Sequence, residues 1–151
     1  MHKSVTVLVA GGGAGFVPYF PGTAGTAVAV PLSLALNAVA ARAFPLGLLL
    51  LCCFVVMAAW LCRKGDEIFA EKDSPKIVVD EIAGFLLANF LSPPEFKTVA
   101  VAFLLFRFFD IMKVFPASWA ETLENGVIMD DLIAGAYTFA ALRALLYWGV
   151  L

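Results

Sequence analysis

Long apolar segments without charged residues dominate the first half of the chain. No Lys, Arg, Asp or Glu lies between Lys3 and Arg42, and none lies between Arg42 and Arg63. About 20 consecutive apolar residues are enough to cross the hydrocarbon core of a bilayer. These segments also lack the polar stripe of a helix on the surface of a soluble protein. The pattern therefore predicts membrane helices, and a soluble bundle with an unusually apolar core is the weaker alternative.

Apolar periodicity and the positions of proline divide the chain into helices. We expect them near residues 24–41, 44–62, 79–92, 96–113 and 130–149. The third and fourth segments are short or carry charge, so they are expected to be tilted or shielded by neighbouring helices. No linker of biased composition divides the chain. The prediction is an all-α integral membrane bundle of about five helices, forming a single domain over residues 1–151.

Composition and charge add an orientation to this picture. The chain is 62% hydrophobic and 15% charged, with a mean hydropathy of +0.94. The connection over residues 63–79 is rich in Lys and Arg, which is typical of loops that stay in the cytoplasm. With this connection inside, four polar motifs come to share the cytoplasmic face, because the helices alternate in direction. These motifs are PGTAGT, VVDEIAG, FRFFDIMK and IMDDLIAG.

Carboxylates are concentrated in three of these motifs. Two adjacent pairs, Asp80–Glu81 and Asp130–Asp131, accompany Asp110. So many carboxylates cannot all remain ionised at a lipid boundary without a compensating charge. Oxygen ligands without nearby His or Cys suit Mg²⁺ or Mn²⁺ better than zinc. We interpret the two pairs as metal ligands; for either pair alone, favourable interaction with a helix dipole is the alternative explanation.

Each acidic pair is followed by two small residues. Ala83–Gly84 and Ala134–Gly135 would let the third and fifth predicted helices approach closely, as small residues do in membrane packing. A close approach would bring the acidic pairs together. The short similarity between the two motifs can also arise by chance.

The fourth predicted helix carries cations beside a carboxylate. Arg107, Asp110 and Lys113 recur every three residues, so they lie along one side of the helix. Arg can bind two phosphate oxygens at once and Lys supplies a mobile charge, while Asp110 could ligate a metal or handle a proton. The alternative is an intrahelical salt bridge with an outward-reaching lysine.

Two glycine-rich stretches differ in what they indicate. In PGTAGT, a helix start offers backbone N–H groups and hydroxyls that can bind an anion, at residues Gly22, Thr23, Gly25 and Thr26. Ordinary helix capping explains the same pattern. The GGGAG stretch at residues 11–15 lacks the Lys of a phosphate-binding loop, so we interpret it as a flexible turn.

Taken together and in order, the four motifs resemble those of the phosphatidylglycerophosphatase A family of bacterial inner-membrane lipid phosphatases. The resemblance extends from about Gly15 to Tyr137, and Thr26 keeps the hydroxyl of the family's usual Ser. Two departures concern loop geometry. Val114 stands where the family usually has a proline, and residues 124–126 replace a more glycine-rich turn.

The resemblance implies Mg²⁺-dependent hydrolysis of the terminal phosphate of phosphatidylglycerophosphate, in glycerophospholipid biosynthesis. The expected partners are this lipid and the bilayer, with no nucleic acid and with the oligomeric state left open. The expected location is the bacterial inner membrane, with several spans and a cytoplasmic active site. The expected roles are catalytic for Asp80, Asp110 and Asp131, substrate-binding for Thr23, Gly25, Thr26, Arg107 and Lys113, and metal-binding for Asp80, Glu81, Asp130 and Asp131.

Other functions fit the sequence less well. The only histidine is His2, at the terminus, which argues against a histidine-nucleophile phosphatase, and no cysteine is followed six residues later by arginine. A divalent-cation channel or carrier is the main alternative from another class, but it predicts acids distributed through the bilayer. A purely structural membrane subunit is a third possibility.

Overall fold

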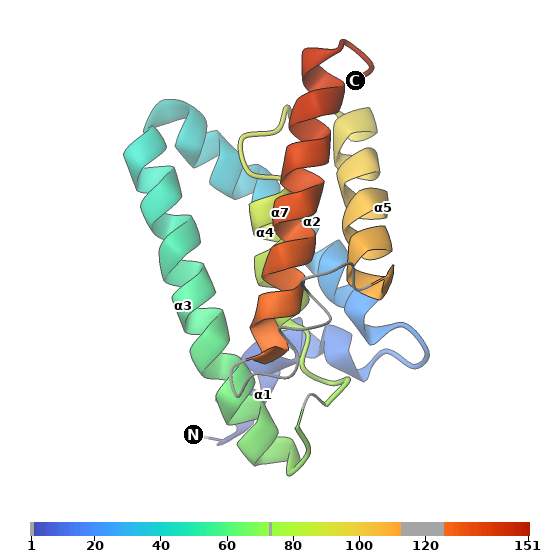
Figure 1. The fold of residues 1–151 in the computed structure, drawn as a ribbon. Helices are drawn as coiled ribbons and strands as arrows, with labels where there is room; N and C mark the ends of the chain where they lie inside the picture. The colour runs from blue at the N-terminus through green and yellow to red at the C-terminus, as the bar shows by residue number, and fades with distance from the viewer. Residues whose placement is uncertain (1, 73, 113–125) are drawn as a thin grey trace.

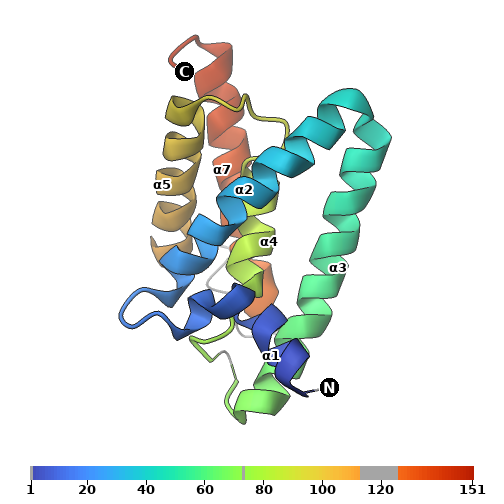
Figure 2. The same cartoon turned by 180° about the vertical axis from the view of Figure 1, so that it is seen from behind.

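The computed structural model describes residues 2–72, 74–112 and 126–151, and the regular secondary structure of these residues is all helical (Figures 1 and 2). Its elements are α1 (His2–Val9), η1 (Gly11–Phe16), α2 (Pro21–Arg42), α3 (Phe44–Phe69), α4 (Val79–Ala88), α5 (Phe96–Met112) and α7 (Gly126–Tyr147). The predicted all-α class is confirmed, and the five predicted helices correspond to α2, α3, α4, α5 and α7.

Several boundaries differ from the prediction: α2 begins three residues early at Pro21, and α7 begins four residues early at Gly126 and ends two residues early at Tyr147. α3 continues through the polar residues that follow Cys62 and ends at Phe69, with an ion pair of 2.6 Å between Lys64 and Glu67 on consecutive turns. α4 ends at Ala88, four residues early. The expected flexible turn at residues 11–15 is instead η1, with Gly12 and Gly13 at positive φ, and α1 precedes it. The glycines at residues 11–13 indicated a turn, which hid η1.

α4 forms the centre of the bundle and contacts α2, α3, α5 and α7 (Figures 1 and 2). Eight of its ten residues are buried. The shielding expected for this short helix is therefore confirmed. α4 packs closely on α7 because both lack side chains at the crossing: a Cβ on Gly135 would overlap the Gly84 carbonyl oxygen, and one on Gly84 would lie 2.6 Å from the Asp131 carbonyl oxygen. The close approach predicted from these small residues is confirmed.

A polar network closes the C-terminal end of α4, where the helix stops inside the bundle. The Asn37 amide donates to the Asn89 carbonyl at 2.8 Å, and its oxygen accepts the Leu91 N–H at 2.8 Å. Arg143 on α7 donates to the Phe90 carbonyl and the Ser92 hydroxyl. Backbone away from water needs such partners, since unpaired groups there are costly. Side chains from α2 and α7 thus let a half-length helix end within the protein.

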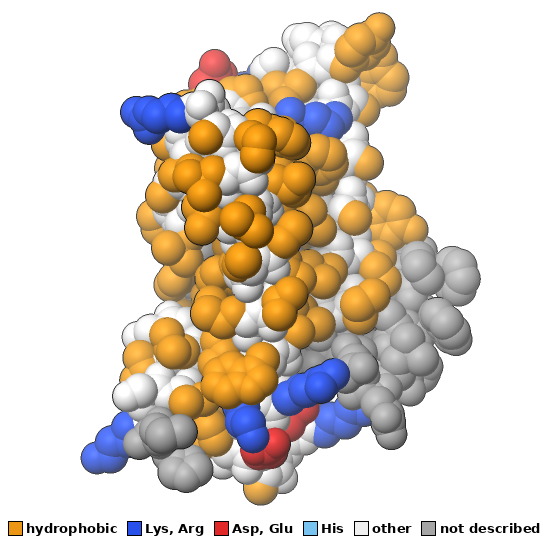
Figure 3. Space-filling view, turned by 90° about the vertical axis from the view of Figure 1, so that its left-hand side faces the viewer, with side chains coloured by type: hydrophobic (Ala, Val, Ile, Leu, Met, Phe, Trp, Pro, Cys, Tyr) orange, Lys and Arg blue, Asp and Glu red, His pale blue; other side chains and the backbone are white. Residues whose placement is uncertain are grey.

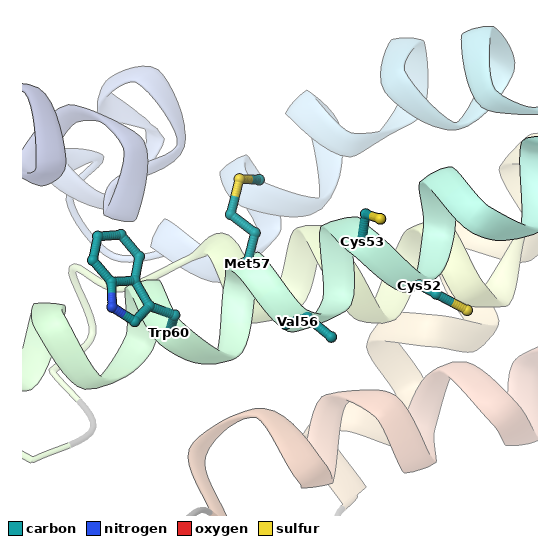
Figure 4. A pocket seen from close by; sticks show the side chains of 5 residues that line it. All are labelled: Cys52, Cys53, Val56, Met57 and Trp60. Atoms are coloured by element: carbon teal, nitrogen blue, oxygen red, sulfur yellow. The ribbon is translucent and has the colours of Figure 1, made fainter.

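The outer surface of the bundle is apolar along its length. Among the described residues, α2 and α3 are long and apolar enough to cross a membrane. On the face that α3 presents, hydrophobic side chains cover the middle, and Lys and Arg gather towards both ends (Figure 3). A shallow hollow on α3, lined by Cys52, Cys53, Val56, Met57 and Trp60, belongs to this apolar surface (Figure 4). Such a continuous exposed apolar face is typical of contact with lipid.

Candidate active site

The starts of α2, α4 and α7 and the end of α5 meet at one end of the bundle, the lower end in Figure 1. This arrangement follows from the alternating directions of the helices. It brings together the motifs that the sequence analysis placed on one face, as far as they lie in the described chain.

Three carboxylates form the centre of the site. Asp80 and Glu81 lie in the first turn of α4, and Asp131 lies near the start of α7. One oxygen from each side chain lies within 4.8 Å of the others. Asp80 and Asp131 are only 4% and 5% exposed. The small residues at the α4–α7 crossing produce this convergence, because the carbonyl of Asp131 itself packs against Gly84.

The donor set of this trio suits a divalent cation. Within the described structure, Glu81 Oε2 and Asp131 Oδ1 are buried without a hydrogen-bond partner. Buried acceptors of this kind are costly unless a proton or a cation satisfies them. Crowded negative charges in a poorly solvated site likewise need a proton or a cation to balance them. Carboxylate oxygens are the ligands that Mg²⁺, Mn²⁺ and Ca²⁺ prefer.

Asp130 is placed differently from its neighbour. It is buried, and its Oδ1 accepts the backbone N–H of Asp131 at 3.1 Å. The group of three carboxylates does not include it. Consecutive residues on a helix point about 100° apart, which separates the two side chains. The ligand role expected for Asp130 stays a prediction.

Arg107 and Asp110 flank the carboxylates from α5. The Arg107 guanidinium forms an ion pair with Asp110, and both side chains are largely buried. Arg107 Nε has no hydrogen-bond partner among the described residues. The intrahelical ion pair that was the alternative explanation is therefore present. It uses one side of the Arg107 guanidinium and leaves Nε, a buried donor, near the three carboxylates without a partner in the described chain. An arginine so placed can still bind a phosphate oxygen.

The PGTAGT motif reaches the site through Gly22. A Cβ on this residue would overlap Glu81 Oε1 and would lie 3.1 and 3.2 Å from the two terminal nitrogens of Arg107. No side chain caps the first turn of α2, whose Ncap is Phe20. The backbone at Gly22 therefore touches both charged groups. The sequence analysis placed Gly22 at a helix start suited to an anion but did not include it among the substrate-binding residues, and its closeness to Glu81 and Arg107 was not predicted.

The other residues of this motif have structural contacts. Gly25 packs against Val78, where a Cβ would lie 2.7 Å from the valine Cβ. The buried Thr26 hydroxyl donates to the Gly22 carbonyl at 2.9 Å, so it holds the first turn of α2 in shape. Thr23 lies in that first turn and is partly exposed. The direct substrate-binding roles expected for Thr23, Gly25 and Thr26 stay predictions.

Lys113, expected to bind substrate, lies outside the described residues, as do Val114 and Pro116. Val114 and residues 124 and 125, where the sequence departs from the family pattern, are therefore not described by the structure.

The fold and the site define a helical membrane protein with a buried carboxylate–arginine centre at one end. The family model described as "Phosphatidylglycerophosphatase A" matches residues 7–146, nearly the whole chain. The chain belongs to this family, which confirms the resemblance seen in the motifs. Membership places it among the phosphatases, a class of hydrolases.

Curated relatives agree with this assignment. A Haemophilus influenzae protein named "Phosphatidylglycerophosphatase A" is 32% identical over 95% of this chain and 90% of its own length. An Escherichia coli protein of the same name is 29% identical over 85% and 76%. A Bacteroides thetaiotaomicron protein named "Putative phosphatidylinositol-3-phosphatase" is 34% identical over 85% of each chain. No solved structure matches the chain significantly.

Proposed function

We propose that this protein hydrolyses the terminal phosphate monoester of phosphatidylglycerophosphate, giving phosphatidylglycerol and inorganic phosphate, in glycerophospholipid biosynthesis. The observation that carries the proposal is the meeting of three carboxylates, Asp80, Glu81 and Asp131, with Arg107 and the backbone of Gly22. The names of the Haemophilus and Escherichia relatives supply the substrate.

The proposed metal is Mg²⁺, held by Asp80, Glu81 and Asp131, with Asp130 as a further ligand. The fit rests on the buried acceptors without partners and on an all-oxygen donor set. When bound, the ion would polarise the phosphoryl oxygens and favour ionisation of a water molecule.

The remaining groups bind and orient the phosphate. Arg107 offsets negative charge on the phosphoryl oxygens, and Asp110 holds the guanidinium in place through its ion pair. The first turn of α2, which contains Gly22 and has no side-chain cap, would add backbone N–H donors and a favourable helix dipole. Lys113, which directly follows Met112 in the sequence, is proposed as a second cation for the phosphate.

In the reaction, the bond between phosphorus and the glycerol oxygen breaks as a new oxygen–phosphorus bond forms on the opposite side. The proposed nucleophile is water or one of the aspartates. A water proton passes to Asp80, Asp110 or Asp131 and then to the departing glycerol oxygen or to phosphate. An aspartate nucleophile would give an acyl phosphate that water then hydrolyses. We also propose that the chain is a single domain, because the described groups of the site come from α2, α4, α5 and α7 of one bundle.

We further propose that the chain spans the bacterial inner membrane several times with its site in the cytoplasm. The supporting residues are Arg63, Lys64, Lys72 and Lys76, which lie at the site end of the bundle and would remain inside. The Escherichia coli relative named "Phosphatidylglycerophosphatase A" is bacterial, which supports a bacterial location.

Phosphate release from phosphatidylglycerophosphate micelles by purified protein tests the activity. We expect release that requires Mg²⁺ and stops with excess chelator. Phosphatidylinositol 3-phosphate is the second candidate substrate, because the Bacteroides relative carries that activity in its name. A higher kcat/KM for the inositol lipid would replace our substrate assignment. Release from neither lipid, together with cation flux into vesicles, would support the channel alternative instead.

A further inference from the structure

Five consecutive apolar residues project from the protein next to the candidate site. We call residues 16–20 the aromatic loop: Phe16, Val17, Pro18, Tyr19 and Phe20. All five are exposed, and Tyr19 and Phe20 are 91% and 70% exposed. In Figure 1 this segment is the blue loop that extends sideways from the lower part of the bundle. Clustered exposed aromatic side chains indicate a surface that contacts something other than water.

One end of the aromatic loop packs against the chain before α4, and the other leads into the site. On one side, Gly15 packs so closely on the chain before α4 that a Cβ would overlap the Lys76 carbonyl oxygen. On the other side, Phe20 leads directly to Gly22, which touches Glu81 and Arg107. The loop is therefore a projection of fixed position beside the charged centre.

The backbone of Tyr19 is strained, and contacts of its side chain within the protein do not offset this strain. Its φ is +72°, in the left-handed region that bulky residues rarely adopt. Such strain is usually retained where function requires it. Here the conformation presents an aromatic ring almost entirely outside the protein.

The glycines that lead into the aromatic loop lie at the level of the last apolar turns of α3, and the loop projects at a similar height in Figure 1. Gly11 and Gly12, at the base of η1, line an apolar hollow together with Met57 and Leu61 of α3. Those two residues belong to the last apolar turns of α3 before Arg63 and Lys64. Aromatic side chains with a polar tip, such as Tyr, favour this interfacial level of a bilayer.

We propose that the aromatic loop inserts into the headgroup–acyl boundary of the inner leaflet and guides the lipid substrate into the site. Its occupant is the phospholipid surface, because the loop is apolar, lies at the interfacial level of α3, and ends at the phosphate-facing turn of α2. Insertion beside Gly22 lets the phosphate reach Arg107 and the carboxylates while the acyl chains stay in the leaflet. The guiding role rests on the proposed function, whereas insertion itself does not.

Photochemical cross-linking tests insertion without requiring activity. The photoreactive amino acid benzoylphenylalanine replaces Tyr19 in the full chain, reconstituted in vesicles of phosphatidylglycerol and phosphatidylethanolamine. Leu104, 67% exposed on α5, and Lys72, exposed in the polar segment after α3, serve as lipid-facing and water-facing control positions. We expect phospholipid adducts at positions 19 and 104 and none at 72. Absence of lipid adducts at 19, or adducts to a second copy of the chain instead, would overturn the proposal.

Kinetics test the guiding role. The double variant Tyr19→Ser, Phe20→Ser should raise the KM for substrate in vesicles about tenfold, with kcat within about twofold, because the loss is one of apolar contact with lipid. A short-chain substrate that is monomeric in water should show no change. The matched control is Phe96→Ser, which removes a 90% exposed aromatic ring at the opposite end of the bundle. Equal effects of the two variants would refute guidance by the loop. A wild-type protein that releases no phosphate would refute the proposed function, while cross-linking would still decide insertion.

Discussion

At Gly22, the absence of a side chain lets the first turn of α2 touch two charged groups of the site. An added Cβ would overlap Glu81 and press on Arg107. Glycine is a poor helix former, costing about 1 kcal/mol relative to alanine, so its presence inside α2 has a local cost. The close contact with the carboxylate and the guanidinium explains why that cost is tolerated.

We predict that Gly22→Ala lowers kcat/KM about 10- to 100-fold by displacing Glu81 and Arg107 from their positions. Helix propensity alone would leave the thermal stability unchanged or raise it. The measurements are phosphate release and the melting temperature in detergent. The control is Ala27→Ser, which adds one heavy atom at an exposed position of α2. Full activity of Gly22→Ala would show that the backbone contact is not needed.

A second prediction concerns the acidic trio. Asp131→Asn keeps the size of the side chain but removes a charge that we assign to metal binding, so kcat should fall by at least about 100-fold. The melting temperature should not fall, because the exchange also relieves repulsion from Asp80 and Glu81. Glu71→Gln, at an exposed position, is the control. Metal-dependent turnover that survives in Asp131→Asn would remove this residue from the site.

At the level of helices, α4 and α7 form the pair that assembles the site. Gly84 and Gly135 bring the two backbones into contact, and this contact places Asp131 beside Asp80 and Glu81. The other end of α4 is closed by Asn37 and Arg143. A short helix is thereby fixed at both ends by residues far away in the sequence.

We predict that Gly135→Ala lowers stability by about 1–3 kcal/mol, as overpacking of a close contact does. It should also reduce activity, because the helices must separate and carry Asp131 away from the other carboxylates. Thermal melting and phosphate release are measured together. Ala136→Leu adds more volume at the next position, which is exposed, and should change neither. A fully stable and active Gly135→Ala would mean that the crossing accommodates a methyl group.

The positions and types of the helices were predictable from the sequence to a useful degree, because apolar periodicity and prolines depend on local order. The acidic pairs and the small residues after them also correctly indicated that α4 and α7 meet. The contact of Gly22 and the polar closure at Asn37 were not predictable, since both depend on which distant segments the fold places together. η1 was missed because its glycines favour a turn and a 3₁₀ helix alike.

For the whole molecule, a charged site is attached to one end of an apolar bundle. The bundle supplies the lipid-facing surface, and its alternating helices bring their polar ends together. The three clustered carboxylates come together only in the folded protein. A cation that binds them together should therefore stabilise the folded state.

We predict that Mg²⁺ raises the melting temperature of the wild-type protein, because a ligand that binds the folded state stabilises it by about 2.7 kcal/mol at ~100 times its Kd. Asp131→Asn should show little of this increase. Thermal melting in detergent at a series of Mg²⁺ concentrations measures the effect, with K⁺ at matched ionic strength as the control. An equal increase in both proteins would mean that the ion acts elsewhere.

Two aromatic rings pack in the bundle next to the carboxylates, and their position has a consequence for the cell. Phe85 and Phe106 are fully buried and meet edge to face at 5.9 Å, one helical turn beyond Glu81 and directly beside Arg107. In the orientation proposed above, this aromatic pair lies between the carboxylates and the outer side of the bilayer, so protons and phosphate would exchange with the cytoplasm alone. An energised membrane could then host the site without losing its electrical potential through it.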